Sequence, residues 1–364
     1  MGTNILADNN SVLDSRNPND STSIISRDAA TDNVLGSGKL NKLLISKIDG
    51  PFIDSQKQTK YVSRKHTYTY YAIINNEIVE KEIKKVKWAV SYDDSTANNS
   101  FYLFAGGFVE NGRIKVDIKI SEGVEKFKIY AYTGDYPDKN TPYIEVFFKK
   151  SITFFIGGAG DKEKNLGFGP SYIVRDEALR PYISKLSSTD LLNPNNVLIS
   201  ENDVYLGYNE IYKMDRIRKN ILSKIKDKKG VSVNIVGHSL GGWNGAYLST
   251  ILSNLGYNVN LLITLDPVGT KYGVTLVSDI YLEYPVPKSK YWVNIQTNPE
   301  IYDGDDYIAW LGGQWEPDKR TTNNYLVVPY HHREVDKMFS YIIAGKNTTE
   351  DFLLIFTAAY LNSK

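Results

Sequence analysis

Apolar and polar positions alternate with a period of two in several short runs near the start of the chain. The clearest is RIKVDIKI at Arg113–Ile120, where every second residue is apolar. Such a period places successive side chains on opposite faces of a half-buried strand. Five more runs predict strands at Thr67–Ile74, Val86–Tyr92, Phe101–Gly106, Lys126–Thr133 and Tyr143–Phe148. Strands spaced by roughly 8–12 residues predict a β-sandwich over residues 45–150, with Trp88 in its core.

After residue 150 the pattern changes to strands that alternate with helices. Apolar runs predict strands at Ile152–Gly158, Val231–Val236, Leu261–Leu265 and Tyr291–Thr297. Helical spacing predicts helices at Asn209–Lys228, Gly241–Leu255, Arg333–Ala344 and Thr349–Leu361. This order predicts an α/β domain over residues 151–364, with a mostly parallel sheet and helices on both faces.

Residues 1–44 differ from both later parts. They are rich in Asn, Asp and Ser and show no periodicity. A segment of that composition cannot bury enough apolar surface to fold alone, so we expect a flexible N-terminal arm.

Composition excludes several classes of function. The chain has 364 residues, with 43 Lys and Arg against 42 Asp and Glu, so its net charge of +1 gives no reason to expect a nucleic-acid partner. Cysteine is absent, which removes disulfides and thiol nucleophiles. The GSGK run at residues 36–39 lacks most of a phosphate-binding loop, so no cofactor is predicted. Asp303, Asp305 and Asp306 are interpreted as a solvated acidic loop, and no metal site is predicted.

The N-terminal sequence bears on localisation. Its first residues are polar and lack a basic stretch followed by an apolar run, so no signal peptide is predicted. No apolar run reaches the length of about 18 residues that a membrane-spanning helix needs. We therefore expect a protein that is cytoplasmic in the cell that makes it, or that leaves by a route without a leader.

A GHSLG motif at residues 237–241 joins a predicted strand to a predicted helix. In this context G-x-S-x-G is typical of the nucleophile elbow, in which a tight turn exposes the serine, here Ser239. The N–H of Leu240 and that of Gly158 or Ala159 are the candidate oxyanion donors. The alternative is a glycine-rich turn with an incidental serine.

A serine nucleophile needs a base and an acid that orients the base. Asp266 follows the next predicted strand, so it is the predicted orienting acid. The chain has four histidines, of which His66 falls in the β-rich part and His238 in the elbow, where it is expected to support the turn and point away from the nucleophile's partner. His332 is the predicted base, with His331 as second choice.

These motifs resemble those of a known family. The GHSLGG elbow is similar to that of lipase-type α/β-hydrolases. More narrowly, FFIGGAGD, TLDPVG, WLGGQW and PYHHREVDKMF resemble segments of lipase-like toxic effectors delivered by bacterial type VI secretion, and residues 45–150 resemble the Ig-like modules that precede such enzymes. The resemblance implies hydrolysis of a lipid ester or phospholipid in competing bacteria, and a cognate immunity protein. For the N-terminal region two alternatives stay open: it binds a secretion-apparatus component, or it binds nothing.

Two alternatives stay open. One is an acyl hydrolase of a non-lipid substrate, such as a thioesterase, a peptidase or another esterase. The other is a non-catalytic interaction protein with a vestigial elbow. About 65 residues separate Asp266 from His332, longer than an ordinary loop. Their aromatic residues fit either a lid or acyl-chain wall, or ordinary core packing: Tyr281, Tyr284, Trp310 and Trp315.

Overall fold

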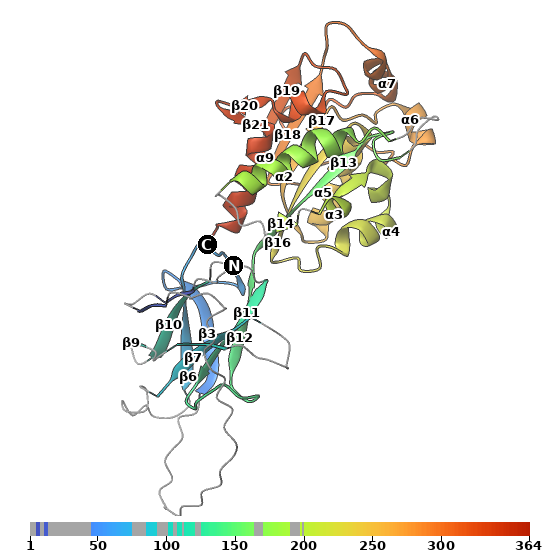
Figure 1. Ribbon diagram of the computed structural model, residues 1–364. Helices are drawn as coiled ribbons and strands as arrows, with labels where there is room; N and C mark the ends of the chain where they lie inside the picture. The colour runs from blue at the N-terminus through green and yellow to red at the C-terminus, as the bar shows by residue number, and fades with distance from the viewer. Residues whose placement is uncertain are drawn as a thin grey trace, which may run out of the picture. The chain divides into compact units, whose positions relative to one another are not determined.

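The structure, a computed structural model, contains two compact units, Met1–Phe148 with Lys364 and Lys149–Ser363 (Figure 1). It describes residues 45–74, 85–92, 101–104, 108–110, 113–120, 125–163, 170–189, 197–198 and 200–364. Most of the predicted arm lies outside these residues. Within the arm, only the backbone of two strands is described, β1 (Ile5–Ala7) and β2 (Ser11–Leu13), and β1 pairs with β10 (Arg113–Ile120).

The first unit is all-β, as the alternating pattern predicts. One sheet has the order β2-β1-β10-β6-β3-β4, with β9 also paired to β10, and the other has the order β5-β12-β11-β7-β8. The remaining strands are β3 (Ile45–Ile53), β4 (Gln56–Lys57), β5 (Tyr61–Val62), β6 (Tyr68–Ile74), β7 (Lys87–Ser91), β8 (Phe101–Phe104), β9 (Phe108–Glu110), β11 (Lys126–Tyr132) and β12 (Tyr143–Phe148).

Both sheets contribute to one core. Tyr70 and Ile114 come from the first sheet, and Trp88 and Ile129 from the second, and all four are fully buried in a single apolar cluster. The six predicted strands and the core position of Trp88 are confirmed. Strand β3 was not predicted, because its sequence ISKIDGPFI is interrupted by Gly50 and Pro51.

The second unit contains a sheet of parallel strands in the order β14-β13-β16-β17-β18-β19, with β15 also paired to β13. These strands are β13 (Lys150–Gly157), β14 (Val197–Leu198), β15 (Tyr205–Gly207), β16 (Val231–His238), β17 (Asn258–Leu265), β18 (Tyr291–Thr297) and β19 (Asn324–Val328). The predicted α/β class with a parallel sheet is therefore confirmed. Its four predicted strands correspond to β13, β16, β17 and β18.

Helices cover both faces of this sheet. Neighbouring side chains on a strand point to opposite faces. Asn234 of β16 donates to Thr357 Oγ1 of α9 (Thr349–Leu361) at 3.1 Å. The next residue, Ile235, packs 3.2 Å from the point where a Cβ on Gly245 of α5 (Leu240–Asn254) would lie. Helices α5 and α9 therefore lie on opposite faces.

The other helical segments are short. They are the π-helix η1 (Arg175–Leu179), α2 (Arg180–Ser188), α3 (Glu201–Val204), the 3-10 helix η3 (Tyr208–Ile211), α4 (Met214–Ile217), the π-helix η4 (Arg218–Leu222), α6 (Tyr272–Val277), α7 (Gly304–Gly312) and α8 (Val335–Phe339). The small strands β20 (Ile342–Ala344) and β21 (Asn347–Thr348) form a hairpin before α9. No described helix is both long and apolar enough to cross a membrane.

Two predicted helices are wrong in extent. The single helix predicted for residues 209–228 is broken into η3, α4 and η4, because Lys213 has a φ of 67°, which is incompatible with a continuous helix. Its apolar face is nevertheless buried, at Ile211, Ile217, Ile221 and Ile225. The helix predicted for residues 333–344 is shortened to α8, since its last three residues pair as β20.

Candidate active site

Ser239 lies in a tight turn between β16 and α5. Its φ and ψ are 56° and −127°, a conformation that costs energy in any residue other than glycine. The turn is held from both sides, because Ser239 N donates to Leu265 O at 3.1 Å and Ser239 O accepts from Val268 N at 3.1 Å. A Cβ on Gly237 would lie 2.4 Å from Gly241 O, so the crossing of strand and helix has no room for a side chain.

Asp266 lies at the end of β17, beside the turn, and is fully buried. Its carboxylate accepts from Thr297 Oγ1 at 2.7 Å, from Thr297 N at 3.0 Å and from Gln314 Nε2 at 3.0 Å. Burial raises the pKa of Asp266, but the hydrogen bond and charge of His332 and the bonds from Thr297 outweigh it, so the net pKa is lowered. Asp266 is therefore ionised at neutral pH.

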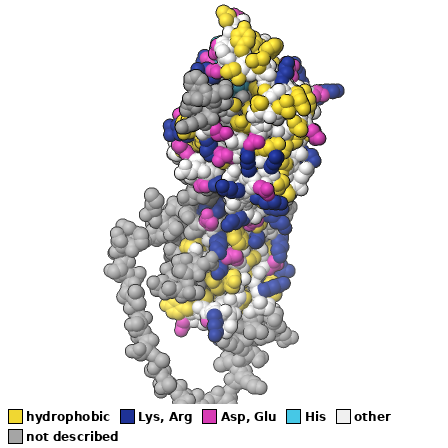
Figure 2. All heavy atoms as spheres, turned by 90° about the vertical axis from the view of Figure 1, so that its right-hand side faces the viewer, with side chains coloured by type: hydrophobic (Ala, Val, Ile, Leu, Met, Phe, Trp, Pro, Cys, Tyr) yellow, Lys and Arg dark blue, Asp and Glu magenta, His cyan; other side chains and the backbone are white. Residues whose placement is uncertain are grey.

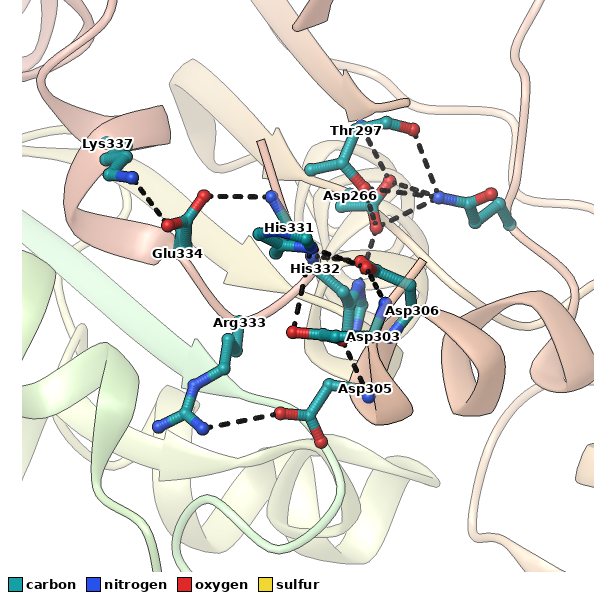
Figure 3. Close-up of polar contacts among 11 residues, drawn as sticks. Asp266, Thr297, Asp303, Asp305, Asp306, His331, His332, Arg333, Glu334 and Lys337 are labelled. Carbon is teal, nitrogen blue, oxygen red and sulfur yellow. Dashed lines mark hydrogen bonds and ion pairs between the residues drawn. The ribbon is translucent and has the colours of Figure 1, made fainter. Parts of the chain in front are cut away.

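His332 brings an imidazole to this carboxylate. Its Nδ1 lies 2.5 Å from Asp266 Oδ2 (Figure 3). Because an ionised carboxylate can only accept, Nδ1 carries the proton of this hydrogen bond, and Nε2 is the ring nitrogen that remains to act as a base. The pairing therefore fixes the tautomer that a general base requires.

Ser239 and His332 line the same pocket, which we call the serine pocket. Its volume is about 370 Å³. Apolar residues make up most of its wall, including Leu240, Val268, Val274, Val277, Ile308 and Ala309. Within the described residues, no hydrogen bond joins Ser239 Oγ to the His332 ring, although both residues line this cavity. Such bonds are often long in a ligand-free site and tighten when substrate binds.

The predicted oxyanion donors surround Ser239. Ala159 and Leu240 line the serine pocket, and a Cβ on Gly158 would lie 2.6 Å from Ser239 Cβ. Leu240 is the first residue of α5, so its N–H has no acceptor within the helix. Gly158, Ala159 and Leu240 therefore lie next to Ser239.

Asp161 supports the loop that carries Gly158 and Ala159. It is buried, and its carboxylate accepts from Tyr205 Oη at 2.7 Å and from Val174 N at 3.1 Å. Burial raises the pKa of Asp161, although the hydrogen bond from Tyr205 opposes this. A Cβ on Gly157 would lie 2.3 Å from Asp161 Oδ2, so this side chain packs directly beneath the loop.

His331 points to a different carboxylate. Its Nδ1 lies 2.6 Å from Asp306 Oδ2, and Asp306 Oδ1 accepts from the His332 backbone N at 2.7 Å (Figure 3). The hydrogen bond to Asp306 raises the pKa of His331. His331 does not line the serine pocket, whereas His332 does. The geometry therefore favours His332, the first choice from sequence, over His331.

The interpretation of YDGDDY as a solvated acidic loop is wrong for Asp306, which is only 3% exposed. Asp303 caps α7 by accepting from Asp305 N and Asp306 N, and Asp306 Oδ2 accepts from Asp303 N at 2.8 Å. Helix capping explains the spacing of these acids. Asp306 thus connects α7, which forms part of the pocket wall, to the backbone of His332.

The potential ligand atoms of Asp303, Asp306 and His331 lie within 4.8 Å of one another. The cap and the contact between His331 and Asp306 use Asp303 Oδ1, Asp306 Oδ2 and His331 Nδ1. We therefore assign them a structural role.

The expectation that His238 points away from the nucleophile's partner is wrong. Its Nε2 lies 2.8 Å from His332 O, and the two imidazole centroids are 4.6 Å apart. Burial chiefly, with the nearby His332, lowers the pKa of His238 to about 3, so the ring is neutral and Nε2–H donates to that carbonyl. His238 therefore holds the main chain of His332.

Sequence reasoning missed four contributors to the site. Thr297 ends β18, the strand that pairs with β17. Asp266 was predicted because it follows a strand of the parallel sheet, and the same reasoning predicts Thr297 beside it. Asp161 directly follows the glycines of FFIGGAGD, and Gln314 lies within WLGGQW. Nothing in the sequence distinguishes Asp306 from its acidic neighbours Asp303 and Asp305.

Comparisons with known proteins add little to this geometry. The sequence matches no family model and no curated protein. One similar solved structure is described as "the putative cell surface hydrolase from Lactobacillus plantarum WCFS1", with 9% identity over 59% of this chain and 92% of that chain. Its TM-score is 0.30, too low to carry an argument about activity. The fold class therefore rests on the parallel sheet and its helices.

Proposed function

We propose that the protein is a serine ester hydrolase with an α/β-hydrolase fold, in which Ser239, His332 and Asp266 form a catalytic triad. One observation carries the proposal: a strained serine and an imidazole fixed by a buried carboxylate line the same pocket. Strained backbone of this kind concentrates at functional sites.

In the proposed reaction, Ser239 Oγ bonds to the acyl carbon while its proton passes to His332 Nε2. The N–H groups of Leu240 and of Gly158 or Ala159 stabilise the oxyanion. The His332 proton then moves to the oxygen of the leaving alcohol as the ester bond breaks. Water attacks the acyl-enzyme, again through His332, and releases the acid and the free serine.

We further propose that the substrate is a lipid ester. The serine pocket is lined mainly by apolar side chains, which suits an acyl chain. Helices α6 and α7 form part of its wall, and both helices expose apolar side chains, of which Val277 and Ile308 line the pocket itself. The exposed apolar residues of the two helices are Tyr272, Leu276, Val277, Tyr307, Ile308, Trp310 and Leu311. We call this set the apolar rim. Apolar side chains are visible on this part of the α/β unit in Figure 2. Exposed apolar groups in such number favour contact with an aggregated lipid over a dilute soluble ester.

The test is hydrolysis of p-nitrophenyl esters of increasing chain length and of phospholipid vesicles, by wild-type protein and Ser239→Ala. We expect the variant to lose about a millionfold in kcat. Wild-type turnover by Ser239→Ala would refute the triad. Preference for short soluble acyl groups would instead favour a thioesterase, a peptidase or another non-lipid esterase.

The biological setting is proposed from the resemblance of motifs alone. It is that of a lipase effector delivered into competing bacteria, which a cognate immunity protein neutralises. Directing the wild-type chain to the periplasm of a susceptible bacterium should arrest growth, and Ser239→Ala should not. Equal growth with both proteins would remove the toxin part of the proposal and leave the hydrolase intact.

A further inference from the structure

A second pocket adjoins the serine pocket. Its volume is also about 370 Å³, and we call it the acidic pocket. Tyr208, Val277 and Ser278 line both pockets, so the two cavities share one wall. The acidic pocket is lined in addition by Glu163, Asn209, Leu276 and Asp279.

The charged groups that line the acidic pocket are both carboxylates, Glu163 and Asp279. Asp279 is neutralised by Arg216, whose Nη1 lies 2.5 Å from its Oδ2. Glu163 has no ion pair within the described part of the chain. Its buried Oε1 has no hydrogen-bond partner there, and neither does the buried Asn209 Oδ1.

These two oxygens converge on Gly207. A Cβ on Gly207 would lie 3.0 Å from Glu163 Oε1 and 3.0 Å from Asn209 Oδ1. A third oxygen nearby, Glu210 Oε2, is already satisfied by Lys162 Nζ at 2.7 Å and by Gly207 N at 2.8 Å. Lys162, one of the two lysines that flank Glu163 in the sequence, is therefore occupied by Glu210.

An unpaired buried acceptor is costly unless a donor reaches it. Burial, followed by the nearby charges of Glu210 and Asp279, raises the pKa of Glu163. A positively charged donor would relieve both the missing hydrogen bond and the repulsion between carboxylates. A phosphate or carboxylate would add to that repulsion.

We propose that the acidic pocket is a subsite for a protonated amine carried by the leaving group of the ester, with Glu163 as the residue that binds it. This proposal rests on the proposed hydrolase function, since the wall shared with the serine pocket is what places the alcohol side of the ester beside Glu163. It adds a specificity-determining residue that takes no part in the chemical step.

The test compares two esters of the same shape. The butanoyl ester of 2-(dimethylamino)ethanol carries a protonated amine at pH 7, and the butanoyl ester of 3-methyl-1-butanol has a carbon in place of that nitrogen. We expect wild-type kcat/KM to favour the amine ester by about tenfold, the ratio that about 1.4 kcal/mol of binding supplies. Glu163→Gln should bring the ratio close to one.

The control is Glu283→Gln, which removes an exposed carboxylate of the same unit that lies outside both pockets. Glu283→Gln should keep the wild-type ratio of kcat/KM for the two esters. If this ratio fell as far as in Glu163→Gln, the preference for the amine ester would come from the overall charge of the protein, and the subsite would be overturned.

Equal hydrolysis of the two esters by the wild-type protein would also overturn the subsite and leave the hydrolase standing. Failure to hydrolyse either ester or p-nitrophenyl butanoate, with no labelling of Ser239 by a fluorophosphonate, would overturn both proposals.

Discussion

His332 Nδ1 and Asp266 Oδ2 lie 2.5 Å apart, and the carboxylate is fully buried under Thr297 and Gln314. Hydrogen bonds from these neighbours and from His332 hold the acid in its charged form and fix the orientation of the imidazole. The imidazole of His238 also packs near that of His332, with ring centroids 4.6 Å apart. Five consequences can be measured.

Asp266→Asn should lower kcat by about 10⁴-fold while leaving the fold intact, because an amide NH₂ facing Nδ1 would favour the wrong tautomer of His332. Steady-state kinetics with p-nitrophenyl butanoate measures the loss, and circular dichroism monitors the fold. The control is Asp305→Asn, which changes an acid that is half exposed near Arg333. Equal activity of Asp266→Asn and wild type would contradict the orienting role.

His331 and His332 should separate clearly. His332→Gln should lose roughly 10⁵- to 10⁶-fold in kcat, as removal of a base does. His331→Gln removes the contacts with Asp306 and Asp303, which lie outside the serine pocket, so its loss should be far smaller. The opposite order would show that His331 is the base.

The pair of His331 and Asp306 also predicts a dependence of stability on pH. The pKa of His331 is raised, chiefly by its hydrogen bond to Asp306, so its contribution is complete below its ordinary pKa of about 6.5 and is lost as pH rises through the raised value. Burial raises the pKa of Asp306, but the bond to His331 and the backbone donors outweigh burial, so the net pKa is lowered and the contribution of Asp306 is lost as pH falls through that lowered value. The difference in Tm between wild type and His331→Gln should be largest near pH 5 and shrink toward pH 9. A difference that grows with pH would contradict the pairing.

Gly158→Ala should cost about 100-fold in kcat, because the new Cβ would lie 2.6 Å from Ser239 Cβ and displace the serine or the oxyanion donors. The matched control is Gly273→Ala, where no atom lies within 4 Å of the added carbon. Both variants are assayed with the same soluble ester. If Gly158→Ala matched its control, the loop after β13 would not form part of the site.

The apolar rim predicts a preference for lipid surfaces. Leu311 is 64% exposed on α7, and Leu311→Asp should lower the ratio of vesicle to soluble-ester hydrolysis about tenfold through lost apolar burial. Ile355→Asp, on the exposed side of α9, is the control and should leave the ratio near that of wild type. An unchanged ratio in Leu311→Asp would argue against membrane contact through the rim.

Much of this fold follows from local sequence. Arg113–Ile120 and Tyr291–Thr297 form strands with the predicted bounds, because each has an unbroken apolar pattern between turn residues. Lys213 interrupts the predicted helix because its backbone φ is positive, which cannot be predicted from a lysine side chain. The strand order could not be predicted from the local sequence pattern either, because strand pairing depends on contacts between residues far apart in the sequence.

The candidate site also has residues that local sequence predicts and contacts that it does not. Ser239 and Asp266 were predictable because each follows a buried strand at the same edge of a parallel sheet. The contacts of His238 with His332 and of Asp306 with His331 join residues far apart in the sequence, and no spacing encodes them. Glu163 was missed for a related reason. The lack of a hydrogen-bond partner for its Oε1 is known only from the structure, which places Asn209 and Gly207 beside it.

The most direct test of the account is covalent labelling by a fluorophosphonate, read by mass spectrometry of the intact protein and its peptides. The account predicts one adduct per chain, on Ser239, no adduct in Ser239→Ala, and much slower labelling in His332→Gln. A folded wild-type protein whose Ser239 stays unlabelled, or reacts at the same rate without His332, would contradict the claim that this imidazole activates this serine.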